Sequence, residues 1–258
     1  MVRLIITGAA GKMGRAIIGT AVQDRGFEIA GLTEAKGHPL VGTQDTITHL
    51  VIRDDLAEVI DKGDVIIDFT EPKSSIAHLK VAEEHKKAIV IGTTGFSDAD
   101  LARIRETRDT RVVFSPNMSM GMNLMFDLVE RAARILKDNF DIEILEMHHK
   151  WKKDAPSGTA LRIKDIIEQA DKARAWEEVY GRQGVIGERK KDELAVLALR
   201  GGDIVGEHTV FFAGVGERLE ITHRAYSREN FARGALIAAR WLVKQGNGVY
   251  SMKDVLGL

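Results

Sequence analysis

The 258-residue chain carries 37 basic and 38 acidic residues, a formal net charge of −1, and no cysteine. The balanced charge offers no electrostatic footprint for nucleic acid, and the lack of cysteine excludes disulfides, thiolate metal sites and cysteine nucleophiles. No apolar run reaches the roughly 18 residues of a membrane-spanning helix, and the N-terminus enters an apolar strand without a signal-peptide pattern. We therefore expect a soluble, cytoplasmic protein with no membrane or nucleic-acid partner.

The first half of the chain predicts a parallel sheet with helices on both faces. Val2–Thr7 is typical of a strand buried on both sides, and apolar residues at helical spacing follow from Met13 to Ala21. Alternating strands and helices indicate a Rossmann-type, doubly wound α/β fold, with a dinucleotide-binding domain over 1–119. The other expected strands are Phe27–Leu32, Val65–Phe69, Ala88–Ile91 and Arg111–Phe114, and the expected helices are Asp54–Asp61, Ser74–His85 and Asp98–Glu106.

A glycine-rich loop joins the first strand to the first helix. Gly8, Gly11 and Gly14 have the spacing G-x-x-G-x-x-G, and such small residues let a pyrophosphate approach the backbone at a helix N-terminus. The alternative is a tight turn that binds nothing. Because the loop opens a βαβ unit, we favour a dinucleotide. The expected contacts are Gly8, Ala9, Ala10, Gly11, Lys12 and Met13.

Glu34 ends the second strand, 20 residues after Gly14, where an acid commonly accepts hydrogen bonds from the adenosine ribose. Lys36 can instead face the 2′-phosphate of NADPH, so we expect both cofactors to be used, with NADH not disfavoured. The alternative is a solvated pair of loop residues. Two later loops lie at the strand ends where such sheets bind ligands. They contribute Phe69, Thr70, Gly92, Thr93 and Thr94.

The second half predicts a different architecture. A helical apolar pattern runs from Leu124 to Leu136, and the strand Asp141–Met147 follows. Further strands indicate an α+β domain over 120–229 with an open, mixed or antiparallel sheet, whose uncovered face favours pairing with another copy of the chain. We interpret it as the substrate-binding and oligomerisation domain. Its remaining strands are Glu193–Leu199, Glu207–Phe212 and Arg218–Arg224.

The last predicted element is a helix from about Arg228 to Lys244, with Ser227 as its N-cap. Its apolar face needs a partner, and we expect the tail to return to the first domain. Residues 230–258 would then complete the dinucleotide-binding domain.

Residues 146–160 concentrate the side chains that can carry chemistry. His148 and His149 lie at the end of the Asp141–Met147 strand, and three lysines follow within four residues. A histidine buried in the core, a solvated lysine loop and a metal site are the alternatives. The metal site lacks a third ligand at suitable spacing, so we expect no metal.

A helix follows this cluster, from Pro156 to about Ala173. We expect the N–H groups of Ser157, Gly158 and Thr159 to be free to bind a carboxylate, aided by the helix dipole. Proton donors beside an anion-binding helix N-terminus predict an anionic small-molecule substrate.

The segment Glu146-x-His-His-x-x-Lys-x-Asp-x-Pro-Ser-Gly-Thr-Ala160 resembles the signature of bacterial dihydrodipicolinate reductase, now described as 4-hydroxy-tetrahydrodipicolinate reductase. Further motifs are similar to that family in the same order, so the resemblance covers nearly the whole chain. They are the glycine loop, Asp68-Phe69-Thr70, Gly92–Phe96, Gly202–Thr209 and Gly216–His223.

The resemblance implies NAD(P)H-dependent reduction of 4-hydroxy-2,3,4,5-tetrahydrodipicolinate to tetrahydrodipicolinate with loss of water, in the diaminopimelate route to lysine. It implies that His148 and Lys152 are catalytic, that His149, Gly158 and Thr159 hold the dicarboxylate substrate, and that the enzyme is a homotetramer. The cofactor contacts that it implies are Gly8–Met13, Glu34, Gly92–Thr94, and Ser115, Pro116, Asn117 and Met118.

Two departures from the family pattern concern the cofactor. Ala35 stands where an arginine often follows the ribose-binding acid, and Glu71 stands where an arginine can occur. Both remove guanidinium groups that would hold a 2′-phosphate, which favours NADH or dual use. The rival hypotheses are an aspartate- or homoserine-type dehydrogenase and a regulator that binds NAD without chemistry.

Overall fold

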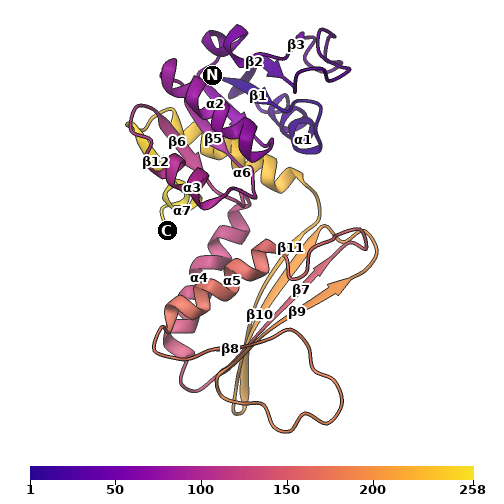
Figure 1. Cartoon of the computed structure of the whole chain (residues 1–258), viewed down its shortest axis with the longest axis vertical. Coiled ribbons are helices and arrows are strands. Elements are labelled where there is room, and N and C mark those ends of the chain that lie inside the picture. The colour runs from indigo at the N-terminus through magenta and orange to yellow at the C-terminus, as the bar shows by residue number, and fades with distance from the viewer. The chain divides into compact units, whose positions relative to one another are not determined.

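The computed structural model describes residues 1–258 and contains two compact units (Figure 1). Unit 1 comprises Met1–Met120 together with Arg228–Leu258, and unit 2 comprises Gly121–Ser227. Unit 1 is thus built from both ends of the chain.

Unit 1 is built on a seven-stranded sheet whose strand pairs are all parallel, in the order β12-β6-β5-β4-β1-β2-β3. The chain leaves β1 toward β2 on one side and later places β4 on the other, so the strand order reverses at β1. Such a reversal opens a crevice at the carboxyl ends of the strands. The predicted Rossmann-type fold is confirmed. The strands are β1 (Val2–Thr7), β2 (Phe27–Thr33), β3 (Ile52–Arg53), β4 (Val65–Asp68), β5 (Ala88–Ile91), β6 (Arg111–Phe114) and β12 (Gly248–Tyr250).

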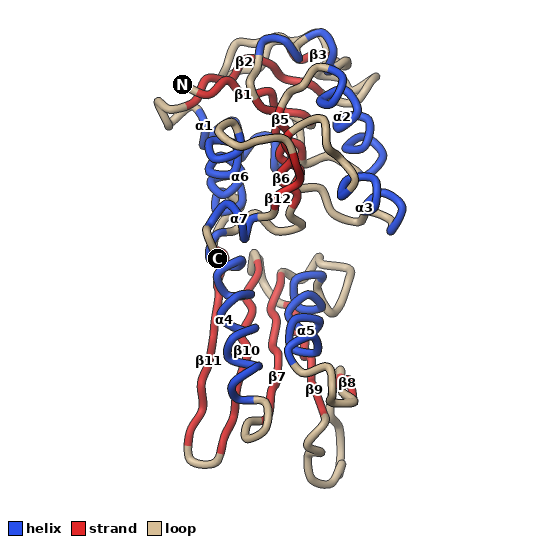
Figure 2. The backbone as a smooth tube through the Cα atoms, turned by 90° about the vertical axis from the view of Figure 1, so that its left-hand side faces the viewer, coloured by secondary structure: helices blue, strands red, loops and turns tan.

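Helices cover both faces of this sheet, as Figure 2 shows. Helices α1 (Lys12–Ala21) and α6 (Glu229–Leu242) pack on one face with Leu4 and Ile6 of β1. Helices α2 (Pro72–Glu84) and α3 (Asp98–Arg105) pack on the other face with Ile5. Because successive side chains of a strand point to opposite faces, one short apolar strand contributes to two cores. The short α7 (Met252–Leu256) ends the chain.

Two local predictions are wrong. The expected helix over Asp54–Asp61 is a pair of 3-10 turns, η1 (Leu56–Glu58) and η2 (Ile60–Lys62), because Val59 between them has a φ of −121° that interrupts helical backbone. The expected cap Ser227 is not the N-cap of α6. That position belongs to Arg228, whose side chain makes no capping hydrogen bond.

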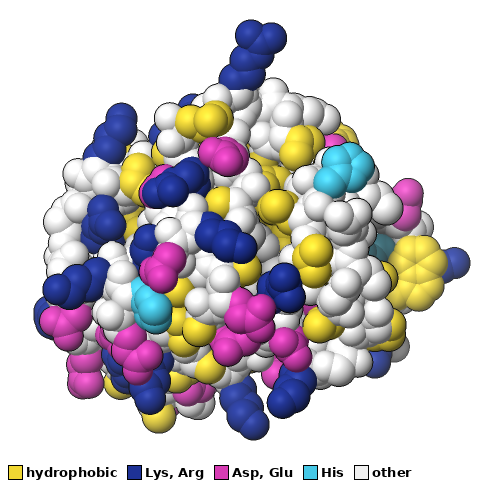
Figure 3. Space-filling model, turned by 90° about the horizontal axis from the view of Figure 1, so that it is seen from above, with side chains coloured by type: hydrophobic (Ala, Val, Ile, Leu, Met, Phe, Trp, Pro, Cys, Tyr) yellow, Lys and Arg dark blue, Asp and Glu magenta, His cyan; other side chains and the backbone are white.

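The surface carries both signs of charge. On the face drawn in Figure 3, cationic and anionic side chains are interspersed with each other and with apolar ones. This mixture matches the net charge of −1. None of the helices combines the length and the apolar character needed to cross a membrane.

Unit 2 is a five-stranded mixed sheet with helices on one face, in the order β11-β10-β7-β9-β8. The pairs β10/β11 and β10/β7 are antiparallel, whereas β7/β9 and β8/β9 are parallel. Helices α4 (Met120–Leu136) and α5 (Gly158–Ala170) cover the face that carries Ile142 and Ile144. The predicted open mixed sheet is confirmed. The strands are β7 (Asp141–His148), β8 (Glu177–Val179), β9 (Glu193–Arg200), β10 (Gly206–Gly214) and β11 (Glu217–Ala225).

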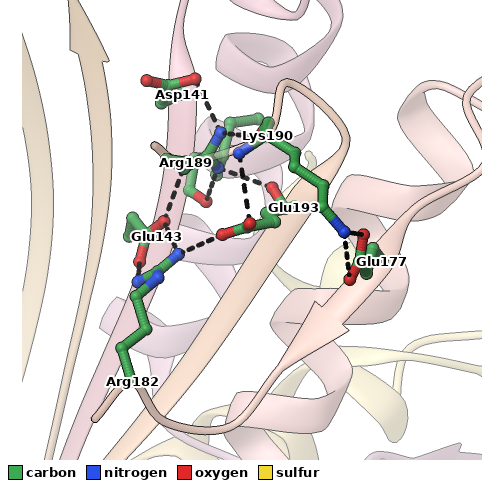
Figure 4. Close-up of polar contacts among 8 residues, drawn as sticks. Asp141, Glu143, Glu177, Arg182, Arg189, Lys190 and Glu193 are labelled. Atoms are coloured by element: carbon green, nitrogen blue, oxygen red, sulfur yellow. Dashed lines mark hydrogen bonds and ion pairs between the residues drawn. The ribbon is translucent and has the colours of Figure 1, made fainter. Parts of the chain in front are cut away.

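The segment between β8 and β9 is held at its base by two arginines (Figure 4). Arg182 donates to both carboxylate oxygens of Glu143 at 2.9 Å and to Glu193 at 2.8 Å. Arg189 donates to Glu143 and to Asp141 at 2.8 and 2.7 Å. Glu143 alternates with the buried Ile142 and Ile144, so these ion pairs lie on the face of the sheet that α4 and α5 leave uncovered.

Candidate active site

The carboxyl end of β1 in unit 1 turns sharply into α1. Gly8 has a φ of +63°, and a Cβ added to Gly14 would lie 2.2 Å from the carbonyl oxygen of Gly8. Gly11 is the N-cap of α1, with no side-chain capping bond and no acid in the first turn. The backbone N–H groups at the start of α1 therefore form a cradle that suits a phosphate.

Glu34, directly after β2, is joined to this cradle. Its carboxylate accepts hydrogen bonds from the backbone N–H groups of Ala10 and Ala35, both at 2.9 Å. Because β1 and β2 are parallel neighbours, with Thr7 opposite Thr33, the acid reaches the loop that follows β1. The structure thus brings together two segments that the sequence separates by 24 residues.

A cavity of about 500 Å³ opens at this edge of unit 1. Three of its lining side chains are acids, Glu34, Asp54 and Glu71, against one lysine, Lys36, and one histidine, His78. The predicted cofactor residues that line it are Gly8, Gly11, Glu34, Lys36, Phe69 and Thr70. The other predicted cofactor residues are not part of its lining.

A buried carboxylate connects the two loops that follow β4 and β5. Asp68 accepts hydrogen bonds from Thr70 N and Oγ1, at 3.0 and 2.7 Å, and from Thr93 Oγ1 at 3.4 Å. Its other oxygen lies 2.8 Å from Nδ1 of His78. The ring of Phe69 packs directly against Gly92, and a Cβ added to Gly92 would lie 2.2 Å from the nearest ring atom. Asp68 and His78 are not among the residues predicted from the sequence, although an acid at the end of an apolar strand could have indicated Asp68.

The segment after β6 also lies at the carboxyl ends of the strands. Ser115 Oγ donates to the carbonyl oxygen of Asn117 at 2.7 Å, and Met118 is buried. A Cβ on Gly234 would lie 1.7 Å from the Met118 carbonyl oxygen, so α6 holds this turn tightly. Ser115–Met118 therefore packs tightly against α6 at Met118.

In unit 2, Glu146 is the centre of a buried charge cluster. Its side chain is 0% exposed. One carboxylate oxygen lies 2.5 Å from His148 Nδ1 and accepts from Arg200 at 2.8 Å. The other accepts from the Ser157 N–H at 3.0 Å and from Arg200 at 2.8 Å. Burial alone would raise the pKa of Glu146, but the hydrogen bonds from His148 and Arg200 outweigh it and lower the pKa to about 2.

A second histidine supports the same turn. His208 Nε2 lies 3.1 Å from Ser157 Oγ, and its ring is edge-on to that of His148 with centroids 5.3 Å apart. Burial, with a smaller contribution from His148, lowers the pKa of His208 to about 3. His208 is therefore neutral at pH 7. Arg200 and His208 are not among the site residues predicted from the sequence, because both come from strands more than forty residues further along the chain.

The expected start of α5 needs correction. Ser157 is the N-cap, and its Oγ accepts from the Ala160 N–H at 3.2 Å. Its own N–H is engaged by Glu146, so the expectation that it is free is wrong. Pro156 precedes the cap instead of opening the first turn, and the helix ends at Ala170 instead of Ala173. Gly158 and Thr159 occupy the first two helical positions.

The loop between β7 and α5 holds the remaining predicted residues. Lys152 donates to Asp154 at 2.9 Å and thereby lowers the pKa of that carboxyl. The carbonyl oxygen of Asp154 accepts from Arg200 at 2.7 Å, so the loop is tied to the Glu146 cluster. Nδ1 of His149 is buried and has no hydrogen-bond partner. The structure contains no group of three or more His, Cys, Asp or Glu side chains that could hold a metal ion.

Comparison with known families covers both units. A model described as dihydrodipicolinate reductase, N-terminus, matches residues 2–118, and one described as dihydrodipicolinate reductase, C-terminus, matches residues 121–256. The chain is 50% identical over 266 residues to a protein of Syntrophus aciditrophicus (strain SB) named 4-hydroxy-tetrahydrodipicolinate reductase, across 100% of this chain and 99% of that protein. A protein of Geotalea uraniireducens (strain Rf4) with the same name is 48% identical over 268 residues and is covered completely, as is this chain.

Solved structures share the fold. A dipicolinate-bound dihydrodipicolinate reductase from Paenisporosarcina sp. TG-14 matches with a TM-score of 0.80 at 23% identity, over 99% of this chain and 100% of that one. A scyllo-inositol dehydrogenase from Lactobacillus casei, with bound NAD(H) and scyllo-inositol, matches with a TM-score of 0.59 at 12% identity, over 99% of this chain and 93% of that one. At these identities, both likenesses concern the fold alone.

Proposed function

Because the chain belongs to the dihydrodipicolinate reductase family, we propose that it reduces 4-hydroxy-2,3,4,5-tetrahydrodipicolinate to tetrahydrodipicolinate with loss of water, using NADH or NADPH, in the diaminopimelate route to lysine. The observation that carries this proposal is the cluster in unit 2. There one buried carboxylate, Glu146, holds both the candidate proton donor His148 and the N-cap of α5. Full-length relatives at 50% and 48% identity bear the name of this activity.

Unit 1 is the proposed dinucleotide-binding domain. The cradle at Gly8–Met13 fits a pyrophosphate because its glycines leave the space that side chains would fill. Glu34 would bind the adenosine ribose, and Phe69, Thr70, Gly92–Thr94 and Ser115–Met118 would form the rest of the site. The cavity is lined by three acids but by only one lysine, Lys36, and one histidine, His78. This excess of acidic side chains disfavours the negatively charged 2′-phosphate of NADPH. The proposal is therefore dual use, with NADH at least as good as NADPH.

Unit 2 is the proposed substrate-binding domain. A carboxylate of the substrate would bind at the N-terminus of α5, at Gly158 and Thr159, with Ser157 shaping the turn and His149 nearby. Loss of water from the 4-hydroxy substrate gives a conjugated imine. A reduced nicotinamide, when bound, would supply a hydride to that imine, and negative charge would develop on the ring nitrogen. Lys152 is the proposed proton donor, and His148 the proposed proton donor or acceptor, so that one of the two supplies the single proton that this charge takes up.

The uncovered face of the unit 2 sheet supports self-association, and the proposed assembly is a homotetramer. Leu199 pairs with Met147 on this face and is 52% exposed. At the far end of the segment held by Arg182 and Arg189, Val185 is fully exposed. Exposed apolar side chains on an open sheet favour burial against another copy. Sedimentation velocity on the purified chain would test this, and a monomer at micromolar concentration would contradict it.

A coupled assay tests the function directly. Dihydrodipicolinate synthase generates the unstable substrate, and the loss of nicotinamide absorbance is followed with NADH and NADPH separately. Turnover with either cofactor supports the reaction. A chain that binds cofactor but shows no turnover would support the regulator hypothesis, and a more than thousandfold preference for NADPH would contradict dual use.

A further inference from the structure

We propose that Glu146 is a positioning residue that couples substrate capture to proton transfer, by holding His148 and the start of α5 in one fixed arrangement. The inference rests on the proposed function, because it concerns how that site works. Glu146 touches no ligand in this role. It acts through His148 on the proton and through Ser157 on the carboxylate-binding turn.

The geometry of the carboxylate supports this role. Its two oxygens face four donor nitrogens from three residues: Nδ1 of His148, the N–H of Ser157, and two nitrogens of Arg200. Each oxygen lies at 2.5 to 3.0 Å from one Arg200 nitrogen and from one of the other two groups. The carboxylate therefore cannot turn toward His148 without also moving the N-cap of α5.

Arg200 extends the arrangement to the loop that carries Lys152. The same guanidinium group that pairs with Glu146 also donates to the Asp154 carbonyl oxygen at 2.7 Å, and Asp154 accepts from Lys152. Both proposed catalytic residues and the proposed carboxylate site are thus connected through the ion pair of Arg200 with the fully buried carboxylate of Glu146. A buried ion pair contributes little net stability compared with apolar residues of similar volume. Its connections to these functional groups give it a use other than stability.

The orientation of His148 follows from the same contacts. With Nδ1 directed at Glu146, only Nε2 remains to exchange a proton with a substrate. The ring edge that carries Nε2 passes over Gly206, where an added Cβ would lie 3.0 Å from Nε2. The contact with Glu146 on one side and the close approach to Gly206 on the other restrict the position of the ring.

Glu143 provides a matched control on the same strand. It is three residues away, is also paired with two arginines, Arg182 and Arg189, and has a side chain that is 22% exposed. Its carboxylate lies on the opposite face of the sheet, where it accepts hydrogen bonds from Arg182 and Arg189 (Figure 4). Loss of charge at Glu143 and at Glu146 removes comparable ion pairs, but only one of them is connected to His148.

The test compares Glu146→Gln, Glu143→Gln, His148→Asn and the double variant Glu146→Gln/His148→Asn. We expect Glu146→Gln to lower kcat by ~10²-fold, which is the lower end of the usual contribution of general acid catalysis. Calorimetry should show dipicolinate binding weakened by about tenfold. NADH affinity should change by less than about twofold. Glu143→Gln should keep the kcat and the dipicolinate affinity of wild type, once sedimentation velocity shows that its assembly is unchanged. In the His148→Asn background, Glu146→Gln should lower kcat by less than about threefold further, because both changes break the same step.

Two results would overturn the inference. One is a kcat for Glu146→Gln within about threefold of wild type, and the other is a full additional loss of kcat in the His148→Asn background. If Glu146→Gln does not fold, Glu146→Gln/Arg200→Gln replaces both charges by amides that can still bond, and the same criteria apply. If wild type itself shows no turnover, the proposed function fails. In that case the role of Glu146 is tested by binding alone. If Glu146→Gln binds dipicolinate with the affinity of wild type and takes up as many protons on binding, the proposed coupling is wrong.

Discussion

Helix α1 of unit 1 and helix α5 of unit 2 both begin where an anion is proposed to bind, but their N-termini are built in opposite ways. The start of α1 has a glycine cap, no side-chain capping bond and no acid in its first turn. The start of α5 has a serine cap that is bonded to His208, to the N–H of Ala160 and, through its own N–H, to Glu146.

The difference shows what each site must do. A pyrophosphate needs only close approach to the backbone and N–H groups. The α1 site is therefore formed by glycines, whose lack of side chains leaves room for the ligand. A substrate that must be protonated needs donors at set positions, so the α5 site depends on an ionised side chain, Glu146, that holds its neighbours in place. Added volume should therefore damage the first site, whereas removed charge should damage the second.

The largest expected effect comes from removing the proton donors of unit 2. His148→Ala and Lys152→Ala should each lower kcat about 10²–10⁴-fold, the usual contribution of general acid catalysis. NADH affinity should survive, because the cradle of unit 1 contains neither side chain. Steady-state kinetics together with NADH titration by fluorescence would check both statements. Near-wild-type kcat in either variant would remove that residue from the mechanism.

Added volume should break the cradle of unit 1. The Cβ of Gly14→Ala would lie 2.2 Å from the backbone oxygen of Gly8, and backbone cannot move as a flexible side chain can. We expect about 1–3 kcal/mol lower stability and at least tenfold weaker NADH binding.

Gly19→Ala on the same helix is the matched control. Nothing lies within 4 Å of its added Cβ, so stability should rise by up to about 1 kcal/mol. Urea unfolding of both variants measures the difference. Equal stabilities for Gly14→Ala and Gly19→Ala would contradict the tight-turn explanation.

Moderate acid should act on unit 2 through its buried histidine. The pKa of His208 is about 3 in the folded chain against an ordinary 6.5, so its contribution is complete above pH 6.5 and is lost as pH falls toward 3. Between pH 6.5 and 5 the loss is on the order of 2 kcal/mol. His223, whose pKa burial also lowers, adds to the same window. Urea unfolding at several pH values should show a flatter profile for His208→Gln. An unchanged slope would show that His208 is not the responsible group.

The smallest expected effect concerns cofactor choice. Glu34→Gln keeps an acceptor for the Ala10 N–H but removes the negative charge beside the cradle. The ratio of the NADPH and NADH dissociation constants should shift by about tenfold toward NADPH, which corresponds to ~1.4 kcal/mol. Titration with each cofactor measures it. A shift in the opposite direction would show that Glu34 does not face the 2′ position.

Periodicity and motif spacing in the sequence determined the order of the elements, the parallel sheet of unit 1, the mixed sheet of unit 2 and the clustering of residues 146–160. These features depend on residues close to one another along the chain. There the alternation or helical spacing of apolar residues shows which face of a strand or helix is buried. Strands of two or three residues, such as Ile52–Arg53 and Gly248–Tyr250, are too short to leave such a pattern.

Only the tertiary structure decided which side chains share a site. Register across the sheet brings Arg200 and His208 to Glu146 from strands 54 and 62 residues away, and the Ser157 N–H, expected to be free, is taken by that carboxylate. Likewise, the packing of α2 on β4 brings His78 to Asp68. No local pattern encodes these contacts, because strand pairing and helix packing join positions whose separation along the chain is arbitrary.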